Sequence, residues 1–78
     1  MKITVKLHTT LKKFAPEESR GVVELELPDG ARAQDAIVAL KIPENFVGAV
    51  FIAGQRVEAS ADLEEGIEVN LIAPIGGG

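Results

Sequence analysis

The clearest period-two patterns of this sequence lie near its two ends, and they restrict the fold more than any other feature. Near the N-terminus, Ile3, Val5 and Leu7 alternate with polar residues, and residues 67–73 alternate in the same way. Such alternation indicates a strand with one buried and one exposed face. Because both strands must bury an apolar face, we expect them to lie side by side in the centre of one sheet.

The residues that follow the first strand predict a second strand and a helix. Residues 22–27 alternate again and end at Pro28-Asp29-Gly30, a sequence typical of turns. Residues 33–41 change to three- and four-residue apolar spacing, which predicts an amphipathic helix that ends before Pro43. Its start has no good N-cap residue, because Arg32 cannot accept hydrogen bonds from free amides as Ser, Thr or Asp would.

Two more strands complete a recognisable order of elements. The uninterrupted apolar run at 48–53 predicts a short buried strand, and residues 56–58 predict a minor one. If the first and last strands pair in parallel, the helix supplies the long crossover that this pairing needs. These elements predict an α+β fold of the β-grasp type, a mixed sheet of four or five strands with one main helix packed on one face.

The side chains available for chemistry are few. The chain has no cysteine, tyrosine or tryptophan, and its one histidine, His8, falls on the exposed side of the first strand. Disulfides and thiolate metal sites are therefore excluded. The net charge of −4 argues against nucleic acid as a partner, and no apolar run approaches the roughly 20 residues of a membrane span. We expect a cytoplasmic protein that is not an enzyme and binds no metal or cofactor.

The most informative stretch is the C-terminal one, Pro74-Ile75-Gly76-Gly77-Gly78. Because glycine loses the most backbone entropy on ordering, we expect a folded domain at 1–75 and a flexible tail at 76–78. No Lys-Ser or Lys-Thr pair follows the glycines, which argues against a phosphate-binding loop. The tail either has no role or, lacking Cβ atoms, threads a narrow channel and presents its carboxylate to an enzyme.

The last strand adds a candidate docking surface. If Val69 and Leu71 face the core, Ile72 faces outward and lies just before Ile75. Two apolar side chains beside the tail would form a patch for a partner protein. The alternative is that the first loop, through Phe14, covers Ile72 as ordinary core.

Several stretches resemble a known family over the whole chain. They are residues 1–7 followed by Leu11-Lys12-Lys13-Phe14, then Leu27-Pro28-Asp29-Gly30-Ala31, Leu63-Glu64-Glu65-Gly66-Ile67-Glu68-Val69, and Ala73-Pro74-Ile75 before the final glycines. In this order and length they resemble the ubiquitin-like sulfur carriers. These are the small subunit of molybdopterin synthase (MoaD) and the carrier of thiazole biosynthesis (ThiS).

The resemblance implies a chemical role for the C-terminus. In that role an adenylyltransferase of the ubiquitin-activating type uses ATP to adenylate the carboxylate of Gly78. A sulfur donor protein, of the cysteine desulfurase or rhodanese type, then displaces AMP and leaves a thiocarboxylate on Gly78, with Gly77 as its slender neighbour. The residues implied to contact partner proteins are Leu71, Ile72, Pro74, Ile75 and Gly76.

Within this family the sequence looks more like the molybdopterin branch, because the first loop at 9–21 is long and Pro74 precedes the tail. The implied client is then the larger subunit of molybdopterin synthase, in the pathway of a molybdenum or tungsten cofactor. In the thiamine branch it would be a thiazole synthase. Two other functions fit the same features: a modifier that joins Gly78 to a target lysine, and a β-grasp interaction domain that never uses its tail chemically.

Overall fold

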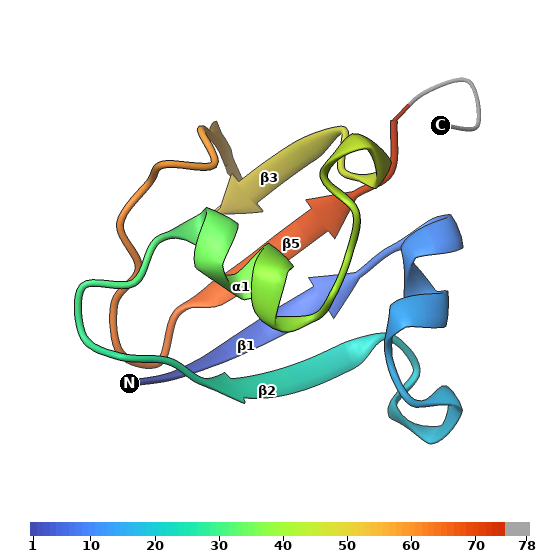
Figure 1. Cartoon of the computed structure of the whole chain (residues 1–78), viewed down its shortest axis with the longest axis horizontal. Helices are drawn as coiled ribbons and strands as arrows, with labels where there is room; N and C mark the ends of the chain where they lie inside the picture. The colour runs from blue at the N-terminus through green and yellow to red at the C-terminus, as the bar shows by residue number, and fades with distance from the viewer. Residues whose placement is uncertain (75–78) are drawn as a thin grey trace.

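The computed structural model describes residues 1–74, and its sheet is built around the two alternating strands that the sequence predicts (Figure 1). The strands are β1 (Lys2–Leu7), β2 (Val22–Glu26), β3 (Ala49–Ile52), β4 (Gln55–Val57) and β5 (Glu68–Ile72). The helix is α1 (Ala33–Ala39), and the 3-10 segments are η1 (Thr9–Phe14), η2 (Glu17–Ser19) and η3 (Glu44–Phe46).

The strand order across the sheet is β2-β1-β5-β3-β4. Strands β1 and β5 pair in parallel, with Val5 opposite Val69, and the other neighbours pair antiparallel. The predicted parallel pairing of the first and last strands is therefore confirmed, with β5 in the centre. The helix α1 lies within the crossover that this pairing requires.

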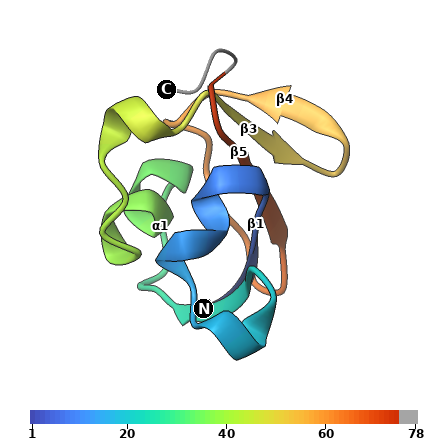
Figure 2. The same ribbon diagram turned by 90° about the vertical axis from the view of Figure 1, so that its right-hand side faces the viewer.

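The core lies between α1 and one face of the sheet, as Figure 2 shows from the side. The alternating residues of β1 and β5 point into it, and the helix adds small and branched side chains. Its buried members are Ile3, Val5, Leu7, Leu11, Ala33, Ala36, Ile37, Ile42, Val50, Leu63, Val69 and Leu71. The other face of the sheet, called here the open face, is not covered by any helix of residues 1–74.

The prediction of a buried strand at 48–53 is wrong in part. Only Val50 of β3 is buried, whereas Ala49, Phe51 and Ile52 are half-buried. The reason is that β3 lies in a sheet with cover on one face, so alternate residues reach the open face whatever their polarity. An apolar run predicts burial on both faces only where helices cover both.

The helix is shorter than predicted and begins by a different means. It ends at Ala39, because Lys41 adopts a left-handed conformation (φ 58°). At its start, the Asp35 carboxylate accepts a hydrogen bond from the Arg32 N–H (2.8 Å). The first free amides donate to a distant segment, Ala33 to the carbonyl of Ala61 (2.9 Å) and Gln34 to that of Ala59 (2.8 Å).

Candidate functional site

The candidate site lies at the end of β5, where the chain leaves the sheet. Pro74 is the last described residue and is half-buried. The predictions for Ile75, Gly76, Gly77 and Gly78 lie outside the described residues, as does the predicted boundary between domain and tail. The described part of the candidate site is therefore the last strand and the residues around it.

Two adjacent residues of β5 have opposite surroundings. The Leu71 side chain is fully buried, with 0% of its surface exposed, and belongs to the core. The prediction that Leu71 contacts a partner is therefore wrong, because the alternation of the strand turns it away from the surface. Ile72 is 36% exposed on the open face and stands among the exposed large apolar residues.

Ile72 is surrounded by side chains of the open face. In the antiparallel pairing of β3 with β5, Ala49 lies opposite Ile72, and Phe51 lies opposite Asn70. Residues that face each other across a ladder lie on the same side of the sheet, so Ala49, Phe51 and Ile72 form one apolar group, the open-face patch. At its border, the His8 ring Nε2–H donates to Asn70 Oδ1 (2.8 Å).

Phe14 does not cover Ile72. Its ring packs edge-to-face against Phe46, with the ring centroids 5.9 Å apart, and both rings pack against the core. The Lys13 ammonium lies 4.9 Å from the Phe46 centroid, within the range of a cation–π contact. This pair joins η1 to η3, so the alternative that the first loop buries Ile72 is wrong.

Gly48, which directly precedes β3, lies against the point where the chain leaves β5. Its N–H donates to the carbonyl of Ile72 (2.7 Å). A Cβ atom at this position would lie 2.6 Å from the Cα of Pro74 and 3.0 Å from the carbonyl carbon of Ala73. The sequence did not single out Gly48, because its neighbours lie some two dozen residues away along the chain and only the fold brings them together.

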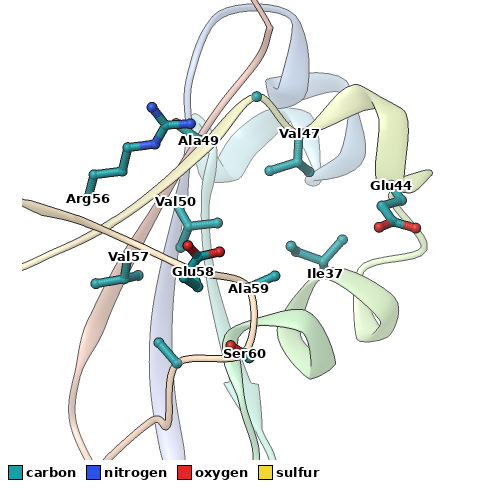
Figure 3. Close-up of a pocket in the computed structure, with 12 residues that line it drawn as sticks. Ile37, Glu44, Val47, Ala49, Val50, Arg56, Val57, Glu58, Ala59 and Ser60 are labelled. Atoms are coloured by element: carbon teal, nitrogen blue, oxygen red, sulfur yellow. The ribbon is translucent and has the colours of Figure 1, made fainter.

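A hollow of about 720 Å³ opens next to Gly48, between α1, η3, the β3–β4 hairpin and segment 58–61 (Figure 3). Its lining is mostly small and apolar, with Glu44, Arg56 and Glu58 as the charged members and Ser60 as the hydroxyl. These residues include no histidine, lysine or cysteine beside Ser60. The lining therefore holds no Ser–His or Ser–Lys pair of the kind that activates a serine nucleophile.

Residues 1–74 contain neither a membrane-spanning helix nor a cluster of potential metal ligands. No helix there is both long and apolar enough to cross a bilayer. In the same residues, no three or more His, Cys, Asp or Glu side chains gather as metal ligands would.

Comparison with known proteins identifies the fold. No protein-family model matches the sequence, and no curated protein matches it significantly. Solved structures do match. SAMP1 from Haloferax volcanii is 21% identical over 100% of both chains, with a TM-score of 0.77. A putative molybdopterin converting factor, subunit 1, from Pyrococcus furiosus is 24% identical over 95% of this chain and 98% of its own, with a TM-score of 0.72.

A third similar structure is that of the Haloferax volcanii HVO 2177 protein, 16% identical over 100% of this chain and 87% of its own, with a TM-score of 0.78. The likenesses extend over the whole fold, and the strand order and single covering helix agree with them. The chain thus has the ubiquitin-like β-grasp fold, as predicted. One of the proteins that share this fold is the putative molybdopterin converting factor, subunit 1.

Proposed function

We propose that the chain is a sulfur carrier of molybdenum or tungsten cofactor biosynthesis and that Gly78 carries the sulfur as a thiocarboxylate. The observation that carries this proposal is the exposed Ile72 at the end of β5, followed after Ala73, Pro74 and Ile75 by three glycines. An exposed apolar side chain this close in sequence to the terminal carboxylate supports a docking role for this surface. A carrier of this kind needs no catalytic side chains, because partner enzymes supply the chemistry.

The proposed reaction has three steps. The carboxylate of Gly78 attacks the α-phosphorus of ATP and releases pyrophosphate, which leaves an acyl adenylate. The terminal sulfur of a persulfide donor protein then attacks the carbonyl carbon and displaces AMP, forming an acyl disulfide. A second thiol attacks the donor's sulfur, releases the thiocarboxylate and leaves the donor oxidised as a disulfide. The adenylyltransferase holds the ATP, so the carrier itself binds no cofactor.

Two findings support this role over a catalytic one. The lining of the hollow beside Gly48 holds no histidine, lysine or cysteine that would activate Ser60 as a nucleophile. A structural neighbour is a putative molybdopterin converting factor, subunit 1, and we propose by analogy that the client is the larger subunit of a cytoplasmic molybdopterin synthase.

A second function is favoured by the other neighbours. Two of the similar structures are SAMP1 and small archaeal modifier protein 1 from Haloferax volcanii. As a modifier, the chain would use the same adenylate of Gly78, and the amine of a target lysine would displace AMP to form an isopeptide bond. The two functions share the activation step and differ only in the nucleophile.

The test is the intact mass of the purified chain after incubation with ATP, a ubiquitin-activating-type adenylyltransferase and a persulfide-loaded sulfurtransferase. A carrier gains the mass of one sulfur minus one oxygen. The matched control lacks Gly77 and Gly78, because removal of Gly78 alone would still leave a terminal Gly-Gly pair. Adducts on lysines of added proteins would favour the modifier, and no change of any kind would contradict both functions.

A further inference from the structure

The backbone conformation of Gly48 does not explain why the residue at this position is glycine. The described glycines with positive φ are Gly21, Gly30, Gly54 and Gly66. Gly48 is not among them, and it is exposed. An exposed residue with ordinary φ that leads into a strand accepts nearly any side chain. The requirement for glycine must therefore come from its neighbours.

The neighbours that exclude a side chain are backbone atoms. A Cβ on Gly48 would lie 2.6 Å from the Cα and 2.7 Å from the nitrogen of Pro74. Real Cβ atoms do not approach other heavy atoms so closely, so the backbone at 73–74 would have to move. Pro74 resists local adjustment because its ring fixes φ.

We infer that Gly48 is a positioning residue for the C-terminal tail, an inference that rests on the proposed function. Gly48 would position the tail through two contacts. Its N–H donates a hydrogen bond to the carbonyl of Ile72 (2.7 Å). Because it has no side chain, the backbone of Ala73 and Pro74 passes directly over its Cα. Together these contacts set the direction in which the chain leaves the sheet. Only four residues separate Pro74 from the carboxylate of Gly78.

The direction of departure matters because a docked carrier must deliver its carboxylate to a fixed point. With the open-face patch seated on a partner, a side chain at position 48 would redirect the tail without altering Ile72 or Phe51. A displacement of about 1 Å at a reacting group costs up to about 100-fold in rate. The expected defect is therefore in turnover rather than in docking.

The variant to make is Gly48→Ala, with Gly54→Ala as the matched control. Gly54 follows the other end of β3, where an added Cβ meets no atom within 4 Å, but its φ of 78° makes alanine strained. The control thus lowers stability without touching the tail. Adenylation is measured by ATP–pyrophosphate exchange with a ubiquitin-activating-type adenylyltransferase, and the amide resonances of ¹⁵N-labelled protein are recorded for all three chains.

For Gly48→Ala we expect kcat to fall about tenfold with KM within about twofold of wild type, and the amide resonance of Ala73 to shift. Gly54→Ala should keep the wild-type kcat and Ala73 resonance. An unchanged kcat in Gly48→Ala, or an equal fall in both variants, would overturn the inference. If the wild-type chain is not adenylated, the proposed function fails, and the Ala73 resonance alone then decides whether Gly48 sets the path of the chain.

Discussion

At the residue scale, exposure separates the side chains of β5 that can bind a partner from those that hold the fold. Ile72 is 36% exposed within the open-face patch, whereas Val38 is 72% exposed on α1, on the opposite side of the sheet. Both are branched apolar residues, but only Ile72 lies beside the tail. Truncating each of these two side chains to alanine therefore compares the loss of an exposed apolar group on two different surfaces.

We predict that Ile72→Ala weakens binding to the activating enzyme about tenfold, or about 1.4 kcal/mol, because truncation removes an apolar contact near the centre of the interface. Calorimetric titration measures the dissociation constant. Val38→Ala is the matched control and should bind as wild type does. Equal binding by both variants would show that the open-face patch is not the docking surface.

Leu71→Ala should act differently, through stability. The side chain is fully buried between the sheet and α1, so its truncation leaves a cavity in the core. We expect the free energy of unfolding to fall by about 3 kcal/mol, as chemical denaturation would measure it. A loss below about 1 kcal/mol would mean that Leu71 is not the core residue that its burial indicates.

The tail glycine Gly77 provides a prediction from sequence. If the tail threads a narrow channel, a branched side chain next to Gly78 obstructs it. We predict that Gly77→Val lowers the rate of adenylation about 100-fold. Its melting temperature should equal that of wild type, because the substitution leaves the buried core described for residues 1–74 unchanged. Adenylation of this variant at the wild-type rate would contradict the threading argument.

At the element scale, the helix begins where a distant loop and one local carboxylate satisfy its free amides. The loop contribution comes from the carbonyls of Ala59 and Ala61, and the local one from Asp35, which accepts from the Arg32 N–H. A helix of seven residues has little stability by itself, so these contacts and the burial of Ala36 and Ile37 hold it.

We predict that Asp35→Ala lowers the free energy of unfolding by about 1 kcal/mol, because it removes the acceptor for the Arg32 amide. Gln34→Ala, also exposed and in the same turn, should change it by less than about 0.5 kcal/mol. Urea denaturation of both variants makes the comparison. A similar loss in the two would show that the Asp35 hydrogen bond adds nothing.

At the scale of the whole molecule, folding and activation should be separable. Among residues 1–74, the buried members of the core run from Ile3 to Leu71. We therefore predict that a chain without Gly77 and Gly78 unfolds with the same free energy as wild type, within about 0.5 kcal/mol, while adenylation is abolished. If this shorter chain still performs its cellular role, the interaction-domain function is correct and the carrier function is wrong.

The sequence predicted the fold where a local pattern coincided with the final surroundings. Alternation in β1 and β5 reports on one covered and one open face, so their pairing and the buried side of each followed directly. In β3 the same reasoning failed, because Ala49 and Phe51 are apolar on a face that no helix of residues 1–74 covers. The 3-10 segments η2 and η3 were also missed, since short turns leave no periodic signal.

Composition and order along the chain thus determined the ubiquitin-like β-grasp, the lack of thiol chemistry and the glycine C-terminus, because each depends on residue type and local period. The tertiary structure decided that Ile72 and not Leu71 meets solvent, that Phe14 packs against Phe46, and that Gly48 touches Pro74. These facts depend on which distant segments meet. No local pattern encodes such contacts, because they are set by how the sheet, the helix and the loops pack together.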